Sequence, residues 1–130
     1  MAYVGDGAWG MSFGEILTCV RERIPVTAVV FHNKQWGAEK KNQVDFYDTR
    51  FVGVNLDNPS FAEIARAMGA DGVTVEHHDQ IGDALATATA SDRMCVVEIM
   101  VTRELGDPFR RDALKKPVRL LDKYKDYTVT

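Results

Sequence analysis

The sequence has no long hydrophobic run and few cysteines, and both absences narrow its class. No stretch approaches the roughly 18 to 20 consecutive apolar residues of a membrane span, and no basic segment with an apolar signal core opens the chain. Its two cysteines, Cys19 and Cys95, sit in apolar runs and form no metal-spaced pair. We therefore expect a soluble, cytoplasmic protein with buried thiols, and we assign the cysteines no chemistry.

A surplus of basic residues is also absent. The 16 Lys and Arg residues against 19 Asp and Glu give a formal net charge of -3. This balance argues against nucleic acid as a partner, and we expect no membrane partner either. A length of 130 residues with 45% hydrophobic content suffices for one compact domain and is too short for two. We expect that domain to span residues 1–101, followed by a surface extension at 102–130.

Strands and helices are predicted to alternate along this domain. Apolar runs indicate four strands, at Ala2–Val4, Val26–Phe31, about Gly72–Val75 and Met94–Val101. Apolar stripes at helical spacing indicate three helices, at about Ser12–Arg23, from Asn58 to Gly69, and around Ile81–Ala88. Strict alternation predicts parallel strands joined by right-handed crossovers. The expected class is therefore α/β, an open, mostly parallel sheet with helices on both faces.

Local signals refine these elements. Ser12 and Glu15 have the spacing of a capping box, and Asn58-Pro59 supplies a helix cap followed by a first-turn proline. The segment from Lys34 to Asp57 is polar and aromatic without clear periodicity. Segments of this length in compact domains are usually functional, so we expect an active-site loop there.

A glycine-rich loop joins the first strand to the first helix. Gly5-Asp6-Gly7-Ala8-Trp9-Gly10 satisfies the pattern G-x-G-x-x-G, which is typical of dinucleotide-binding folds. Its glycines permit a tight turn, and free backbone amides at a helix start can meet phosphate oxygens. An ordinary turn without a ligand fits the glycines as well, so the pattern alone does not identify a cofactor.

Asp6 distinguishes a metal-diphosphate site from a dinucleotide site and from an ordinary turn. A carboxylate among phosphate-binding amides would repel a pyrophosphate unless a divalent cation lay between them, and magnesium favours such oxygen ligands. Asn33 lies 33 - 6 = 27 residues further on, at the end of the next predicted strand. If those strands are parallel neighbours, roughly 4.8 Å apart, both side chains can reach one ion. A dinucleotide fold would instead place an acidic residue where this chain has His32 and Asn33.

Gly5-Asp6-Gly7, followed by 24 residues and then His32-Asn33, resembles the motif of thiamine diphosphate-dependent enzymes. In that family the first residue of the pair is commonly Asn, and the second binds the metal. The resemblance implies the diphosphate-binding domain of the thiamine diphosphate fold, truncated at its amino terminus. The departure leaves the role of His32 open, and we expect a strand-end histidine whose hydrogen bonds are satisfied.

The resemblance also implies a set of site residues. Asp6 and Asn33 would be side-chain ligands of Mg²⁺, and the main-chain carbonyl of Gln35 would be a third ligand. Backbone amides around Gly7 and Ala8 would hold the diphosphate. The cofactors implied are thiamine diphosphate and Mg²⁺.

Three longer blocks are similar to the sulfoacetaldehyde acetyltransferase family. They are Gly5–Ser12, Asn33–Gln43 and Glu104–Arg111. This similarity implies cleavage of sulfoacetaldehyde by phosphate into sulfite and acetyl phosphate, a step of taurine degradation. The alternatives are another thiamine diphosphate enzyme, of the acetolactate synthase or 2-oxo acid decarboxylase type, and a dinucleotide-binding Rossmann-type module.

Anionic reactants call for cationic side chains, and the long polar segment supplies four candidates. These are Lys34, Lys40, Lys41 and Arg50, for each of which a solvated surface role is the alternative. In the family, the glutamate that activates the cofactor belongs to another domain and comes from a neighbouring subunit. No catalytic residue can therefore be assigned here, and we expect this chain alone to be inactive and the complete enzyme to be a homo-oligomer.

One carboxylate is unexplained by these patterns. Glu98 interrupts the apolar run from Cys95 to Val101, where an unpaired buried charge would be costly. The sequence leaves two possibilities open, a paired buried residue and an edge-facing one. Trp36 and its aromatic neighbours in the long segment are expected to anchor that segment to the core.

Overall fold

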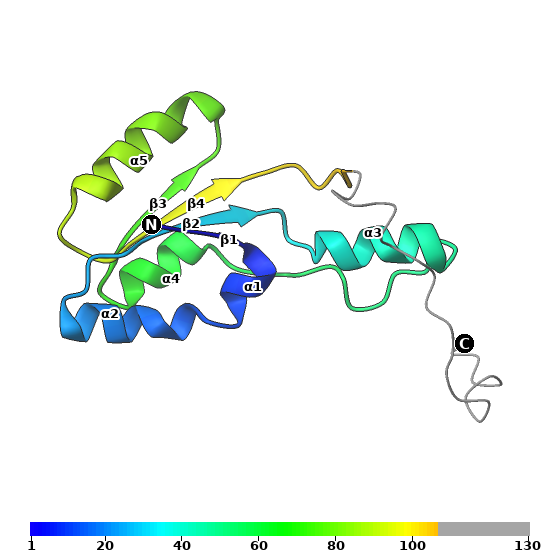
Figure 1. The fold of residues 1–130 in the computed structure, drawn as a ribbon, viewed down its shortest axis with the longest axis horizontal. Coiled ribbons are helices and arrows are strands. Elements are labelled where there is room, and N and C mark those ends of the chain that lie inside the picture. Colours follow the sequence, from blue (N-terminus) through cyan, green and yellow to red (C-terminus); the bar gives the residue numbers. More distant parts are fainter. Residues whose placement is uncertain (107–130) are drawn as a thin grey trace.

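The structure is a computed structural model that describes residues 1–106, and it is built on one parallel sheet (Figure 1). The strands are β1 (Ala2–Gly5), β2 (Thr27–His32), β3 (Asp71–Val75) and β4 (Cys95–Met100). Their order in the sheet is β1-β2-β4-β3, and all three pairings are parallel. The predicted extension lies outside the described residues from position 107 onward.

Helices cover both faces of this sheet, which confirms the predicted class. They are α1 (Asp6–Gly10), α2 (Ile16–Glu22), α3 (Gly37–Phe46), α4 (Phe61–Ala67) and α5 (Ile81–Ala90), with 3-10 turns at Phe13–Glu15 and His78–Gln80. In Figure 1, α2 and α4 lie below the sheet and α5 lies above it. Among residues 1–106 no helix is long and apolar enough to cross a membrane.

The core has two halves, one on each face of the sheet. Ala28, Val30 and Val96 pack with residues of α2 and α4, and Val29 and Val97 pack with residues of α5. Burial on both faces explains why β2 and β4 read as continuous apolar runs. Both thiols are free, and the expectation of buried thiols holds for Cys95 but not fully for the half-buried Cys19.

The predicted start signals of two helices are wrong in detail. Ser12 makes no capping hydrogen bond, and a 3-10 turn precedes a shorter α2. The Ser12 hydroxyl instead lies 3.4 Å from the carbonyl of Ala8, because it already belongs to the turn that ends α1. The cap of α4 is Ser60, whose Oγ accepts a hydrogen bond from the Glu63 amide at 3.2 Å. Asn58 is thereby released for another contact, described below.

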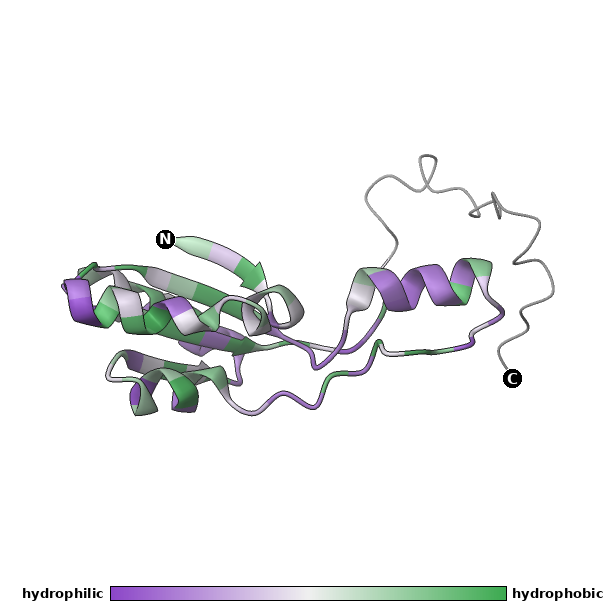
Figure 2. Ribbon diagram, turned by 90° about the horizontal axis from the view of Figure 1, so that it is seen from below, coloured by the Kyte–Doolittle hydropathy of each residue, from purple (hydrophilic) through white to green (hydrophobic). Residues whose placement is uncertain are grey.

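The predicted loop from Lys34 to Asp57 contains a helix, α3. Its few apolar residues form no stripe and none of its residues is buried, so periodicity could not reveal it. Figures 1 and 2 show that α3 and the segment returning from it project away from the sheet. The Gln43 side chain holds the two together, since its Nε2 donates to the Val52 carbonyl at 3.1 Å and its Oε1 accepts from the Val52 amide at 2.8 Å.

Candidate functional site

The site lies where β1 and β2 end, side by side. Gly5 is opposite Phe31 in the parallel register, so Asp6 and His32 follow at the same level of the sheet. Asp6 begins α1 and is only 2% exposed. The carboxyl ends of parallel strands are where α/β folds bind ligands. The predicted juxtaposition of the two strand ends is confirmed.

The Asp6 carboxylate is held through one of its oxygens. Oδ2 accepts hydrogen bonds from the Lys34 amide at 2.8 Å and from Asn58 Nδ2 at 3.3 Å. His32 Nε2 lies 3.7 Å from the same oxygen. Within residues 1–106, all of these contacts reach Oδ2, so the orientation of the carboxylate is fixed and Oδ1 is left for another ligand.

The turn after β2 brings Asn33 and Lys34 to this carboxylate. Lys34 has φ +56°, in the left-handed region that costs a residue with a side chain roughly 1–2 kcal/mol. That turn aims its amide at Asp6, and Asn33 Oδ1 accepts a hydrogen bond from the Gln35 amide at 3.2 Å. Asn33 is half-buried.

Gln35 is buried, at 3% exposure, and is fixed from several sides. It forms an isolated antiparallel bridge with Asn55, flanked by hydrogen bonds from Trp36 N to Val54 O and from Leu56 N to Lys34 O. In such a bridge the central pair does not exchange its own backbone hydrogen bonds, so the Gln35 carbonyl points away from Asn55. It is available as a ligand.

The donor set suits a hard divalent cation. A carboxylate oxygen, an amide oxygen and a main-chain carbonyl are the oxygen ligands that Mg²⁺ shares with phosphates and water. Within residues 1–106 the structure shows no cluster of three His, Cys, Asp or Glu side chains that could hold a metal. The residues present therefore fit Mg²⁺ with a diphosphate.

Gly7 is a close-approach position. A Cβ at Gly7 would lie 2.8 Å from atoms of the Trp36 ring, closer than real Cβ contacts allow. The Trp36 ring thus lies against Gly7 of the glycine loop. Its expected role in anchoring the long segment to the core stays a prediction. Gly7 belongs to the G-x-G-x-x-G pattern, and its contact with Trp36 is enough to explain why a glycine stands there, without a bound ligand.

Gly7→Ala is expected to displace Trp36 and to weaken diphosphate binding by about tenfold, the effect of losing one hydrogen bond to a charged group, because the amides of the loop would shift with the ring. Binding of thiamine diphosphate measured by calorimetry checks this. Gly14→Ala is the matched control, since a Cβ there meets nothing within 4 Å. Equal affinities for both variants would contradict the packing argument.

Glu98 is a paired buried residue, not an edge-facing one. It is 0% exposed. It accepts hydrogen bonds from five groups: Ser60 Oγ (2.6 Å), His32 Nδ1 (2.6 Å), Thr74 Oγ1 (2.9 Å), Phe61 N (2.9 Å) and Ala62 N (3.4 Å). Burial alone would raise the pKa of this carboxyl, but the hydrogen bonds outweigh burial and hold the pKa below its ordinary value. Glu98 is therefore ionised at neutral pH.

Sequence reasoning missed most of this network. Ser60 and Thr74 look like ordinary surface residues, and only the buried acid in an apolar strand was a signal that partners had to exist. Asn58 was predicted to be a helix cap, whereas it binds Asp6. His32, expected to be satisfied, is satisfied only at Nδ1, because Nε2 is buried without a hydrogen-bond partner.

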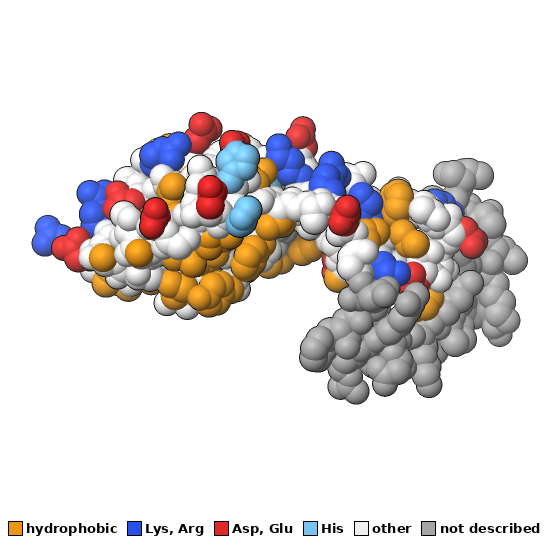
Figure 3. All heavy atoms as spheres, turned by 90° about the horizontal axis from the view of Figure 1, so that it is seen from above, with side chains coloured by type: hydrophobic (Ala, Val, Ile, Leu, Met, Phe, Trp, Pro, Cys, Tyr) orange, Lys and Arg blue, Asp and Glu red, His pale blue; other side chains and the backbone are white. Residues whose placement is uncertain are grey.

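Three of the four candidate cations, Lys34, Lys40 and Lys41, have different surroundings in the structure. Lys40 Nζ is held by Gln35 Oε1 and Asn55 Oδ1, both at 3.1 Å. Lys41 pairs with Asp45 one turn along α3. Lys34 is exposed, with its backbone beside Asp6. Figure 3 shows Lys and Arg side chains gathered where the sheet body meets α3.

Arg103 adds a contact that the sequence did not reveal. It lies after β4, and its Nη2 donates to Asn55 Oδ1 at 2.9 Å. Its carbonyl accepts a hydrogen bond from Gln35 Nε2 at 2.9 Å. The segment after β4 thereby closes over the Gln35 side chain and helps to fix the predicted third ligand.

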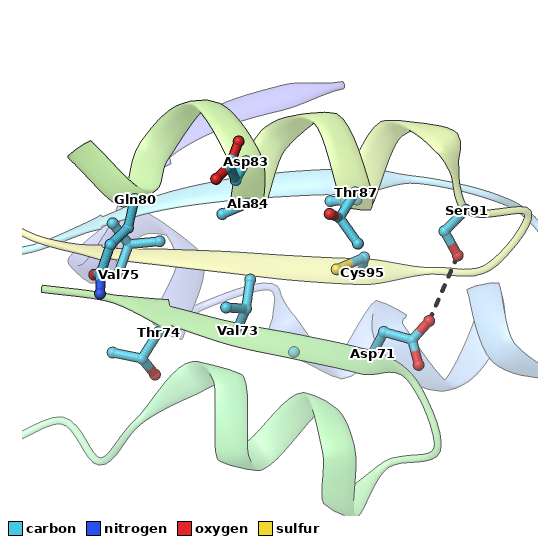
Figure 4. Close-up of a pocket in the computed structure, with 12 residues that line it drawn as sticks. Asp71, Val73, Thr74, Val75, Gln80, Asp83, Ala84, Thr87, Ser91 and Cys95 are labelled. Carbon is cyan, nitrogen blue, oxygen red and sulfur yellow. Dashed lines mark hydrogen bonds between the residues drawn. The ribbon is translucent and has the colours of Figure 1, made fainter. Parts of the chain in front are cut away.

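A cavity of about 560 Å³ lies away from this site, between β3 and α5 (Figure 4). It is lined by residues such as Asp71, Thr74, Asp83 and Cys95, and by none of the predicted ligands. β3, which contributes to its lining, is the last strand of the sheet within residues 1–106. We assign this cavity no role in cofactor binding.

The sequence of this chain is similar to those of known enzymes. The sulfoacetaldehyde acetyltransferase of Alcaligenes xylosoxydans xylosoxydans is 66% identical over 131 residues, covering 98% of this chain and 22% of that protein. The enzyme of the same name from Castellaniella defragrans is 66% identical over 132 residues, with the same coverage of 98% and 22%. The chain thus spans about a fifth of the length of these relatives.

Solved structures agree on the fold. The thiamine diphosphate-dependent 4-hydroxybenzoylformate decarboxylase of Rhodococcus jostii RHA1 superposes with a TM-score of 0.75 at 19% identity, covering 80% of this chain and 20% of that one. The family model "Thiamine pyrophosphate enzyme, C-terminal TPP binding domain" matches residues 1–99. The chain therefore belongs to the thiamine pyrophosphate enzyme family, through its C-terminal TPP-binding domain.

Proposed function

We propose that this chain is the Mg²⁺- and diphosphate-binding part of a thiamine diphosphate-dependent acyltransferase that converts sulfoacetaldehyde and phosphate into acetyl phosphate and sulfite. The observation that carries the cofactor site is Asp6, a buried carboxylate beside the glycine loop, oriented through Oδ2. Identity of 66% to two sulfoacetaldehyde acetyltransferases supports the reaction. The family assignment removes the dinucleotide-binding alternative.

Each protein group has a distinct task in this proposal. Asp6 Oδ1, the Asn33 amide oxygen and the Gln35 carbonyl would hold Mg²⁺, which would neutralise the diphosphate. Amides of Gly7 and Ala8 would hold phosphate oxygens. The bound cofactor would supply a nucleophilic carbanion for the aldehyde carbonyl. The residues described here bind and orient the cofactor, and the catalytic residues remain unassigned.

The substrates are anions, so cationic side chains near the site are proposed to bind them. Lys34 is the first candidate, because its amide contacts Asp6 and its side chain is exposed. Lys40 and Lys41 are already engaged within the chain, which makes them second candidates with Arg50. We also propose that the complete enzyme is a cytoplasmic homo-oligomer. The chain would divide into a domain at residues 1–101 and an extension at 102–130.

Asp6→Ala tests the cofactor site. In the complete enzyme that carries this chain, we expect calorimetric binding of thiamine diphosphate to require Mg²⁺ and to weaken at least tenfold in the variant, because a charged ligand is lost. Asp45→Ala, which removes an acidic side chain from α3, is the control and should bind normally. Metal-independent binding, or unchanged binding in Asp6→Ala, would overturn the proposed site.

The reaction is tested separately by its products. Purified enzyme should release sulfite from sulfoacetaldehyde only when phosphate is present, and it should not consume pyruvate. Pyruvate consumption without sulfite release would instead favour an acetolactate synthase-like enzyme.

A further inference from the structure

Lys40 and Arg103 bring two positive charges together beside Gln35. Lys40 lies in the first half of α3, and Arg103 lies in the segment after β4, which runs toward α3 in Figure 1. The Asn55 side chain joins them, because its Oδ1 accepts hydrogen bonds from Lys40 Nζ at 3.1 Å and from Arg103 Nη2 at 2.9 Å. Two cationic nitrogens therefore share one uncharged oxygen.

No carboxylate of residues 1–106 pairs with either cation. The ion pairs formed in this part of the chain include neither Lys40 nor Arg103. Lys40 Nζ instead contacts Gln35 Oε1 at 3.1 Å and lies 5.1 Å from the centroid of the Phe51 ring, and both groups are neutral. Like charges this close repel each other unless an anion lies between them. The pair therefore lacks a counter-charge among the described residues.

Neutral amides hold this pair in a fixed arrangement. Gln35, only 3% exposed, accepts from Lys40 through Oε1 and donates through Nε2 to the Arg103 carbonyl at 2.9 Å. Gln35 and Asn55 are also the partners of the isolated β-bridge. Each amide side chain thus contacts both Lys40 and Arg103. A carboxylate in the place of either amide would neutralise the cations, whereas an amide orients them and leaves their charge available.

The two cations have donors left for a ligand. An ammonium has three N–H donors and a guanidinium has five. Within residues 1–106, Gln35 and Asn55 accept from the Lys40 ammonium, and Asn55 accepts from the Arg103 guanidinium. Arg103 is exposed and Lys40 is half-buried, so a solute can reach both. The planar fork of an arginine beside the point charge of a lysine suits an anion with several oxygens.

We propose that Lys40 and Arg103 together form a binding site for a tetrahedral oxyanion, the chemical class of both phosphate and the sulfonate group of sulfoacetaldehyde. The inference rests on the proposed function and deepens it, because it names a site for the anionic substrates. Gln35 also carries the proposed third Mg²⁺ ligand, its carbonyl, so the pair lies next to the proposed cofactor site. Lys40 alone is a second candidate for anion binding, and Arg103 supplies the further charge that makes a site.

Lys40→Gln and Arg103→Gln test the inference in the complete enzyme, because each removes one charge. The kcat/KM values for phosphate and for sulfoacetaldehyde are measured from sulfite release. We expect each variant to lower at least one of them by about tenfold or more, the effect of losing a hydrogen bond to a charged group. A loss for phosphate alone identifies phosphate as the ligand, and a loss for sulfoacetaldehyde alone identifies the sulfonate. Losses for both would show that the two anions use the site in turn.

Asn55→Asp tests the charge without loosening the segment, and it decides the matter if the other two variants do not fold. The introduced carboxylate would pair with both cations, so we expect a similar loss of kcat/KM at an unchanged or higher melting temperature. Gln43→Ala is the matched control. It removes the two hydrogen bonds with Val52 that hold α3 but no cation, so both kcat/KM values should change little.

Unchanged kcat/KM values for both substrates in these charge variants would overturn the inference, as would an equal loss in Gln43→Ala. A loss of thiamine diphosphate affinity alone would overturn it too, because the diphosphate would then be the ligand. Calorimetric binding of inorganic phosphate and of the unreactive sulfonate 2-hydroxyethanesulfonate gives a readout that does not depend on the reaction. Binding of either anion that is lost in Arg103→Gln, in an enzyme that releases no sulfite, would refute the proposed function and support the oxyanion site.

Discussion

Gly72→Ala is expected to be among the most damaging single substitutions in this chain, lowering the free energy of unfolding by about 3 kcal/mol or more. A Cβ at this position of β3 would lie 2.3 Å from the carbonyl oxygen of Ala62 and 2.9 Å from its carbonyl carbon. Both atoms are backbone of α4, so no side-chain rotation can relieve the overlap. The strand and the helix would have to separate.

Urea denaturation, compared with Gly82→Ala, measures this effect. Gly82 lies in α5, and a Cβ there meets nothing within 4 Å. Alanine favours a helix over glycine by roughly 0.8 to 1 kcal/mol, so the control should be neutral or more stable. Similar midpoints for the two variants would show that β3 and α4 can move apart easily.

Glu98→Gln is expected to lower the free energy of unfolding at neutral pH by on the order of 3 to 5 kcal/mol. The glutamine keeps the volume but removes the charge that five donors surround, and its own amide hydrogens would face some of them. Thermal or chemical denaturation measures the loss. Glu76→Gln removes an exposed carboxylate just after β3 and should have little effect.

The same residue predicts a pH dependence. The folded-state pKa of Glu98 lies below its unfolded value, so its contribution is fully present above the unfolded pKa. That contribution is lost as the pH falls from the ordinary glutamate range through the folded pKa. Wild-type stability should therefore decline in this acid range more steeply than that of Glu98→Gln. Parallel curves would contradict an ionised Glu98 in the folded protein.

The parts of the fold that sequence could predict are those with strong periodicity. Most residues of β2 and β4 are buried, so the apolar runs Val26–Phe31 and Met94–Val101 were sufficient to identify these strands. Because the strands were predicted to be parallel neighbours, Asp6 and Asn33 were expected to lie together at the carboxyl ends of those strands. The prediction of α3 failed for the opposite reason, because a projecting helix buries no face and leaves no stripe in the sequence.

The candidate site was likewise predictable in part. Asp6 was predictable because an acid in a phosphate-binding loop demands a cation. The contacts that hold Asp6 were not predictable, since one of them comes from Asn58, a residue distant in sequence whose role depends on tertiary packing. Predicted ligands Asn33 and Gln35 lie in the same turn as Lys34, whose left-handed backbone no pattern had indicated.

The projecting α3 segment differs from the sheet in what stabilises it. Gln43, Lys40 and Arg103 hold it by polar contacts, whereas the sheet is held by buried apolar side chains. Segments with few buried apolar contacts open at a lower free energy than the core around them. Within residues 1–106 we therefore expect the α3 segment, which bears Lys40 and Lys41, to open at a lower free energy than the sheet, so that its amide hydrogens exchange faster than those of β2 and β4.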